Sequence, residues 1–250
     1  KFKIPNSLGG YYATFTEFLG FKPYMDEGKF MGLAAYGKYS KKIQSKLDKF
    51  LKYDKSSGFY KVNNKLRYDG KHTFGERFTD EFVKIFGEKR QKNISALTKP
   101  YPDIAFNVQH RLENIVKLLA KNLYKKNNLQ NLCLAGGVAM NCKMNGELSK
   151  EKYIKNIFIQ PAASDNGVSL GAAQILSLKK GIKLNTNLKN VYYGPKYSNS
   201  EILGYLRESK VKYVKLKNIY KDTAKLLYQN KIIGWFQGRM EYGARSLGNR

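Results

Sequence analysis

Apolar residues recur at three- and four-residue steps in several stretches of the chain, which is the spacing of one helical face. The longest such stretch is Asp103–Tyr124, with Pro102 just before it and Asp103 available as a capping side chain. Its apolar positions are Ile104, Val108, Leu112, Ile115, Leu119 and Leu123. This pattern predicts one long helix that buries a single face.

Shorter stretches precede this helix. Asparagine and serine after Pro5 favour a helix start, and Ser7 can cap it. The glycine- and turn-rich stretches between the helical ones predict loops or hairpins. We therefore expect helices at Ser7–Leu19, Lys41–Leu51 and Asp80–Phe86, a loop with short helical turns at Lys22–Lys38, and a hairpin or loop excursion at Tyr53–His72.

Two strand–loop–helix units follow the long helix. Short strands that alternate with helices favour an α/β domain. The first unit comprises a strand at Asn131–Ala135, a turn at Gly136–Gly137 and a helix at Val138–Leu148. The second comprises a strand at Ile157–Gln160, a loop at Pro161–Gly167 and a helix at Val168–Leu178.

The alternation of predicted strands and helices is interrupted after residue 180 and resumes after residue 190. Residues 181–190 are polar without clear periodicity and read as a linker, so we expect domains at 1–180 and 191–250. In the second domain we expect helices at Ser200–Glu208 and Asp222–Gln229, and strands at Val211–Leu216 and Ile232–Phe236.

Composition is compatible with a packed protein: 42% of the 250 residues are hydrophobic and 14% are aromatic. No apolar run is long enough to span a bilayer, so we expect no membrane association. The two cysteines, Cys133 and Cys142, make no disulfide framework and favour a reducing, cytoplasmic setting. The chain lacks an initial Met and ends inside a motif, which suggests a fragment.

The formal net charge of +27 raises the possibility of nucleic-acid binding. Lysine dominates over arginine, however, and lysines are spread along the whole chain rather than gathered in one block. We therefore do not expect nucleic acid to be the main partner. The positive electrostatic potential that this net charge produces would also attract small anions such as ATP.

Two loops that follow strands carry candidate chemistry. At Gly136–Asn141, paired glycines before a helix allow phosphate to approach backbone N–H groups, although a tight turn that binds nothing fits equally well. At Ser164–Gly167, Asp165 could hold a divalent cation, or Asp165 and Asn166 could simply form a turn and cap the next helix.

Two further segments combine charge with glycine. In Glu27–Gly37, Lys29 could meet an anion and Glu27 a substrate hydroxyl or amine, or the segment could be an ordinary packed loop. In Gly238–Arg250, three arginines and one glutamate among glycines suggest a loop that grips phosphate, with a solvated basic turn as the alternative.

Taken in order, these motifs resemble the NodU/CmcH-type O-carbamoyltransferase family. The matching segments are Pro5–Gly9 with Tyr11, Tyr12 and Phe18–Phe21, Glu27–Gly37, Leu134–Asn141, Gln160–Gly167 with Gly171–Ala173, Tyr193–Pro195 and the terminal arginine/glycine loop. Their order and spacing together are specific, although each is modest alone.

The resemblance implies two domains: a TsaD-like domain of actin-like ATPase fold, and the beginning of a YrdC-like α/β domain. It implies that carbamoyl phosphate and ATP, which is used with Mg²⁺, form a carbamoyl-adenylate. The carbamoyl group then passes to the hydroxyl of a small-molecule or sugar acceptor near a divalent metal, often iron.

Residue by residue, the resemblance assigns roles as follows. It places the nucleotide on Gly136, Gly137, Val138, Asn141, Asn166 and Gly167, the metal on Asp165, and the carbamoyl-phosphate/ATP site on Arg239, Glu241, Arg245 and Arg250. Glu27 and Lys29 are the candidate catalytic residues.

Two departures and two alternatives accompany this interpretation. The family's His-x-x-x-His metal motif does not precede Ser7, and Ala244 and Ser246 stand where the family usually has Pro and Ala. The alternatives are a tRNA-binding relative of the threonylcarbamoylation proteins and a sugar-kinase-like ATPase. The acceptor and the oligomeric state cannot be read from these motifs.

Overall fold

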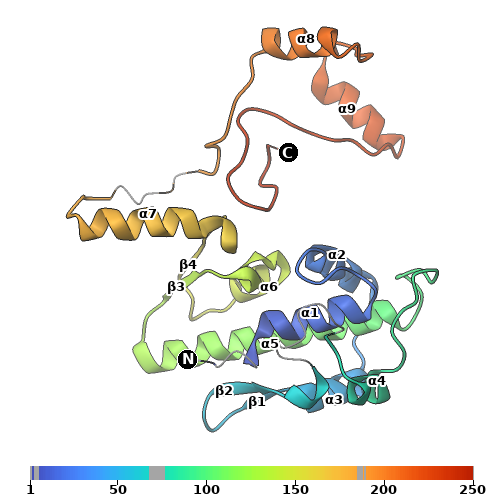
Figure 1. Cartoon of the computed structure of the whole chain (residues 1–250), viewed down its shortest axis with the longest axis vertical. Helices are drawn as coiled ribbons and strands as arrows, with labels where there is room; N and C mark the ends of the chain where they lie inside the picture. The colour runs from blue at the N-terminus through green and yellow to red at the C-terminus, as the bar shows by residue number, and fades with distance from the viewer. Residues whose placement is uncertain (1, 3–5, 68–76, 185–187, 189, 250) are drawn as a thin grey trace. The chain divides into compact units, whose positions relative to one another are not determined.

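The computed structural model describes residues 2, 6–67, 77–184, 188 and 190–249. The chain divides into two compact units, Lys1–Ile159 and Gln160–Arg250, which are described separately below (Figure 1). Mixed helices and small sheets confirm the expected α/β class in its general form. The actin-like and YrdC-like assignments, and the domain limits of 180 and 191, stay predictions.

The first unit is mainly helical. Its α-helices are α1 (Leu8–Phe18), α2 (Glu27–Leu33), α3 (Lys41–Phe50), α4 (Asp80–Phe86), α5 (Tyr101–Asn127) and α6 (Cys142–Leu148). Its short 3-10 turns include η2 (Ala34–Tyr36), η3 (Asn64–Leu66) and η4 (Gly137–Met140). Its strands are β1 (Leu51–Asp54), β2 (Phe59–Val62), β3 (Asn131–Leu134) and β4 (Asn156–Ile159).

Side-chain caps define several helix starts. The Ser7 hydroxyl accepts a hydrogen bond from the Gly10 N–H at 3.0 Å, as the sequence indicated. Ser40 and Thr79 cap α3 and α4 in the same way. The expected cap of α5 is wrong: this helix begins before Pro102, and Asp103 lies in its first turn. The Asp103 carboxylate instead accepts the Lys38 N–H at 2.8 Å, which ties α5 to the preceding segment.

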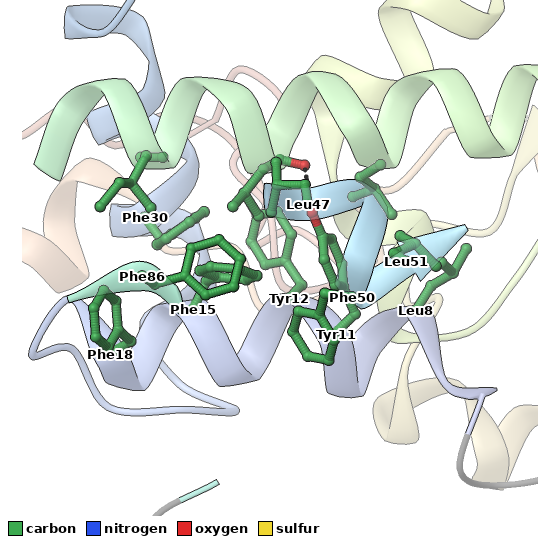
Figure 2. Close-up of a cluster of buried hydrophobic side chains, with 14 of the residues drawn as sticks. Leu8, Tyr11, Tyr12, Phe15, Phe18, Phe30, Leu47, Phe50, Leu51 and Phe86 are labelled. Atoms are coloured by element: carbon green, nitrogen blue, oxygen red, sulfur yellow. Dashed lines mark hydrogen bonds between the residues drawn. The ribbon is translucent and has the colours of Figure 1, made fainter. Parts of the chain in front are cut away.

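Aromatic side chains fill the core of the first unit. Tyr11, Phe15 and Phe18 of α1 are fully buried against residues of α3, α4 and α5 (Figure 2). Phe15 meets Phe86 edge-to-face with ring centroids 5.0 Å apart. Burial of one such side chain contributes about 1.5–3 kcal/mol, so this cluster is a principal source of the unit's stability.

Two small sheets flank the helices. β1 and β2 pair antiparallel, which bears out the hairpin alternative for Tyr53–His72, although the hairpin begins earlier, at Leu51; residues 68–76 lie outside the described part. β3 and β4 pair in parallel, with Asn131 opposite Asn156, and α6 lies between them in the chain. In this parallel pair the carboxyl ends of β3 and β4 lie at the same edge, and the Gly136–Asn141 loop begins just after the end of β3.

The second unit contains η5 (Asp165–Gly167), α7 (Val168–Lys179), α8 (Asn199–Glu208) and α9 (Ile219–Tyr228). A capping box between Ser198 and Glu201 begins α8. The strands expected at Val211–Leu216 and Ile232–Phe236 do not form. Within the described residues these segments have no hydrogen-bonded strand beside them, and a strand needs such a partner.

Candidate functional site

The Gly136–Asn141 loop leaves the end of β3. Gly136 has φ +95°, a left-handed conformation that favours glycine, and nothing lies within 4 Å of where its Cβ would be. Gly136 and Gly137 are exposed, while Val138 is half-buried. The helix expected over Val138–Leu148 is interrupted: η4 ends at Met140, and α6 starts after Asn141. The backbone of both glycines is therefore accessible to a ligand.

Asn141 is buried and is fully engaged within the fold. Its side-chain carbonyl accepts the Met144 N–H at 2.9 Å, which caps α6. The same carbonyl accepts Gln109 Nε2 at 3.1 Å, and Asn141 Nδ2 donates to Gln109 Oε1 at 2.9 Å. Asn141 thus fixes the loop between α6 and α5, which is a positioning role. Its predicted contact with a nucleotide stays a prediction.

Gln109 is the centre of a larger buried network. Tyr12 Oη donates to Gln109 Oε1 at 2.7 Å, and Gln109 Nε2 donates to Glu113 Oε1 at 2.8 Å. Burial raises the pKa of Tyr12 well above its usual value, so its hydroxyl remains a donor. Sequence reasoning missed this network. The available signal was a Gln and a Glu four residues apart, next to the apolar face of the long helix.

Glu27 and Lys29 lie on the short helix α2, in line with the loop with short helical turns expected at Lys22–Lys38. The segment Glu27–Leu33 forms α2 despite its glycines, because Phe30 and Leu33 bury one face. The Glu27 carboxylate accepts the Tyr24 N–H at 2.6 Å. Lys29 Nζ lies 2.8 Å from an Asp26 carboxylate oxygen, and the Lys29 side chain is 69% exposed. The catalytic roles of Glu27 and Lys29 stay predictions.

Contacts link α2 to the glycine loop. The Phe30 and Tyr12 rings meet edge-to-face at 4.8 Å, and Tyr12 belongs to the network around Gln109. Met31 Sδ lies 3.9 Å from Cys142 Sγ, at the start of α6. The first unit therefore brings α2 and the Gly136–Asn141 loop together around Tyr12.

In the second unit, Asp165 and Asn166 are exposed, and Gly167 packs against the carbonyl of Ala162. Among the described residues, no group of three His, Cys, Asp or Glu side chains could hold a metal ion. One exposed carboxylate is not a sufficient ligand set, so the residues present do not by themselves fit the expected iron. Metal binding at Asp165 stays a prediction.

The terminal arginine/glycine loop is organised by Glu241. This carboxylate is 9% exposed and accepts the N–H groups of Leu247 at 3.0 Å and Asn249 at 2.8 Å. Glu241 therefore shapes the loop from inside. Arg239 is exposed and Arg245 is half-buried, while Arg250 lies outside the described residues. The assignment of these residues to a carbamoyl-phosphate/ATP site stays a prediction.

Two predicted segments of the second unit are neighbours. Gly243 has φ +107°, and its backbone packs against the carbonyl of Pro161, where a Cβ would come within 2.5 Å of the oxygen. Hydrogen bonds from Met240 to Pro195 and from Tyr242 to Val191 hold the other side of the loop. The arginine loop and the loop that carries Asp165 thus form one contiguous region of this unit.

The described helices include none that is both long and apolar enough to cross a membrane.

Known proteins resemble this chain over nearly all or about half of its length. An uncharacterised protein of Synechocystis is 38% identical over 99% of the chain, and the match covers 41% of that protein. The nodulation protein NolO of Bradyrhizobium diazoefficiens is 32% identical over 100% of the chain, which covers 43% of NolO. The 3'-hydroxymethylcephem-O-carbamoyltransferase of Streptomyces clavuligerus is 25% identical over 48% of the chain.

The chain thus spans about two fifths of the length of the first of these relatives. Residues 1–174 match the family described as the carbamoyltransferase N-terminus, and residues 224–250 match the carbamoyltransferase C-terminus. The first match contains the Gly136–Asn141 loop and α2, and the second contains the arginine loop. On these matches, the chain belongs to the carbamoyltransferase family.

Proposed function

We propose that the protein containing this chain is an ATP-dependent O-carbamoyltransferase. The observation that carries the proposal is the pair of family matches, at residues 1–174 and 224–250, on the two segments with exposed glycine or arginine loops. The donor is carbamoyl phosphate, activated by ATP as a carbamoyl-adenylate, and the acceptor is a hydroxyl group of a small molecule or sugar.

Activation is needed because a carbamoyl carbon is a poor electrophile. Water first removes phosphate from carbamoyl phosphate and leaves carbamate. A carbamate oxygen then attacks the α-phosphorus of ATP and pyrophosphate leaves, which joins the carbamoyl group to AMP, a good leaving group. In the transfer step the acceptor oxygen forms a bond to the carbamoyl carbon, the bond from that carbon to the AMP oxygen breaks, and the hydroxyl proton is lost. AMP leaves with the bonding electron pair, so groups that stabilise its phosphate accelerate the step.

Residues of this chain can support both halves of the reaction. The exposed backbone at Gly136 and Gly137 allows phosphate to approach N–H groups closely. Arg239 and Arg245 offer planar cations that suit phosphate and carbamoyl oxygens. Glu27, on α2 beside the loop, is the candidate that orients the acceptor hydroxyl.

The distinguishing experiment measures the products of ATP. The full protein is incubated with ATP and Mg²⁺, with or without carbamoyl phosphate, and the nucleotides are separated. We expect AMP and pyrophosphate only when carbamoyl phosphate is present. Release of ADP, or of AMP irrespective of carbamoyl phosphate, would contradict the proposal.

The net charge of +27 favours one second candidate, a tRNA-binding relative of the threonylcarbamoylation proteins. Filter binding of tRNA over a salt series separates the two. Micromolar affinity with a steep salt dependence would support the tRNA-binding candidate, because such a slope reports phosphate contacts. Weak binding at physiological salt supports the small-molecule acceptor.

A further inference from the structure

An open hollow of about 740 Å³ lies over the end of α3 and the β1–β2 hairpin. It belongs to neither of the glycine or arginine loops, and in Figure 1 the hairpin and α6 lie on opposite sides of α5. Its lining contains five lysines, two aspartates, two asparagines and no arginine. The lysines are Lys49, Lys52, Lys55, Lys61 and Lys65, all exposed.

The two carboxylates of the hollow are engaged elsewhere. Asp48 pairs with Arg111 of α5, which is not part of the lining. Asp54 accepts hydrogen bonds from the hydroxyls of Ser56 and Ser57, both at 2.7 Å, and these bonds lower its pKa to about 2. None of the five lysines forms an ion pair with a residue in the described part of the chain.

The register of the hairpin places two of these lysines directly opposite each other. Lys52 of β1 pairs with Lys61 of β2, and both point to the outer face, while Leu51 and Val62 are buried on the inner face. Like charges at directly opposed positions destabilise a hairpin. This strand pair therefore carries a repulsion that a bound anion would remove.

The hairpin that carries the lysines is held firmly by its surroundings. Asn122 of α5 donates to the Gly58 carbonyl at 3.0 Å, at the turn between the strands. Tyr60 Oη donates to the Asn6 carbonyl at 2.7 Å, and the Asn6 side chain accepts the Val62 N–H at 2.9 Å. The lysine positions are thus preorganised, which lowers the cost of binding a ligand.

We propose that this hollow binds a ligand with several adjacent phosphate groups. Lysines act on phosphate as mobile point charges, whereas recognition of a single carboxylate generally relies on the planar fork of arginine, which the lining lacks. A run of phosphates can engage several ammonium groups at once. Such a run occurs in a polyphosphate and in a phosphodiester chain, which share this chemistry.

The test uses the full protein and two probes, inorganic tripolyphosphate and a short single-stranded RNA, in calorimetric titrations at low salt. The variant Lys52→Ala/Lys61→Ala removes the opposed pair. The matched control, Lys121→Ala/Lys125→Ala, removes two exposed lysines from α5 outside the hollow. We expect about tenfold weaker binding in the first variant and less than about twofold weaker binding in the control.

The probes distinguish the two sources of phosphate. If a phosphodiester chain is the ligand, RNA binds more tightly than tripolyphosphate, and the first variant reduces the slope of log affinity against log salt by about 1.5. If a compact polyphosphate is the ligand, the order of affinities is reversed. Equal weakening in both variants would overturn the proposal, because it would show only the general field of the chain; so would no binding of either probe.

A second measurement excludes loss of fold as the cause. Without ligand, Lys52→Ala/Lys61→Ala should unfold at the same temperature as the unchanged protein or at a higher one, since a repulsion has been removed. Tripolyphosphate or RNA should raise the unfolding temperature of the control by more than that of this variant. Carbamoyl transfer should be unchanged in both, and a variant that retains full ligand stabilisation would contradict the assignment.

Discussion

The side chain of Asn141 joins three parts of the first unit. It caps α6, pairs with Gln109 of α5, and through Gln109 reaches Tyr12 of α1. Paired amides that satisfy each other inside a core carry little net stability individually, yet removing one leaves the other unsatisfied. The position of the exposed Gly136 and Gly137 therefore depends on the Asn141–Gln109 amide pair, which tolerates little change.

Replacing Asn141 tests this support. Asn141→Ala removes the cap of α6 and strands the Gln109 amide, so we expect the free energy of unfolding to fall by about 2–4 kcal/mol. Asn114→Ala, which changes an exposed amide of α5, should alter it by less than about 0.5 kcal/mol. Urea denaturation of the full protein measures both.

The Asn141–Gln109 amide pair also predicts that changes at these two residues affect the free energy of unfolding non-additively. Gln109→Met should cost less in the Asn141→Ala background than alone, with a difference of about 0.5–3 kcal/mol. Strictly additive losses would show that the two amides act independently.

Gly37 is a second residue at which the backbone sets a strict limit. A Cβ at Gly37 would collide with the carbonyl of Pro102, whereas a Cβ at Gly32 would meet nothing within 4 Å. We expect Gly37→Ala to lower the free energy of unfolding by about 2 kcal/mol or more, because backbone must move. In the helix α2, Gly32→Ala should raise it by about 0.5–1 kcal/mol. Similar effects of the two changes would contradict the packing described here.

At the scale of elements, a salt bridge between Glu147 and Lys117 links α6 to α5. Glu147 of α6 lies 3.4 Å from Lys117 of α5, and Lys150 approaches the same carboxylate at 2.6 Å. These lysines lower the pKa of Glu147 from 4.5 to about 2, with Lys150 as the largest contributor. A lowered pKa means that the stabilisation is present above pH 4.5 and is lost as the pH falls towards 2.

The corresponding variant is Glu147→Gln. At pH 7 we expect it to lower the free energy of unfolding by about 1 kcal/mol, because solvent screens a partly exposed group. The difference from the unchanged protein should shrink as the pH falls below about 4.5 and vanish near pH 2. High salt should reduce it at pH 7. A difference that grows on acidification would refute the assigned ion pairs.

Helices could be predicted from the sequence better than strands. Apolar periodicity located α1, α3 and α4 because each buries a local face and carries a cap within its own sequence. The two strands expected after α8 and α9 do not form. A strand requires a hydrogen-bonded partner strand, and the local sequence pattern does not indicate whether one is present. Short helical turns were expected around α2, but its bounds were not, because its glycines favour a loop while burial of Phe30 and Leu33 favours the helix.

The candidate site likewise has features that local sequence predicts and features that only the folded structure shows. The motifs singled out Gly136 and the arginine loop, in which Gly136, Gly238, Gly243 and Gly248 adopt positive φ values that favour glycine. The supports of these loops, Gln109 for one and the inward carboxylate of Glu241 for the other, depend on contacts across long stretches of chain. Only the folded structure reveals such contacts.

At the scale of the whole molecule, the chain covers about two fifths of the length of relatives such as NolO. It combines a match to the carbamoyltransferase N-terminus with a short match to the C-terminus. The proposed reaction needs groups from both regions, so activity is a property of the full protein and has to be measured there.

The most direct measurement follows two labels at once. The full protein receives carbamoyl phosphate labelled on carbon, ATP labelled on the γ-phosphate, and a panel of hydroxyl-bearing small molecules and sugars as acceptors. We expect the carbon label on an acceptor hydroxyl, the phosphate label in pyrophosphate, and equal amounts of AMP. Phosphate label on the acceptor, with ADP as product, would contradict carbamoyl transfer and identify a kinase.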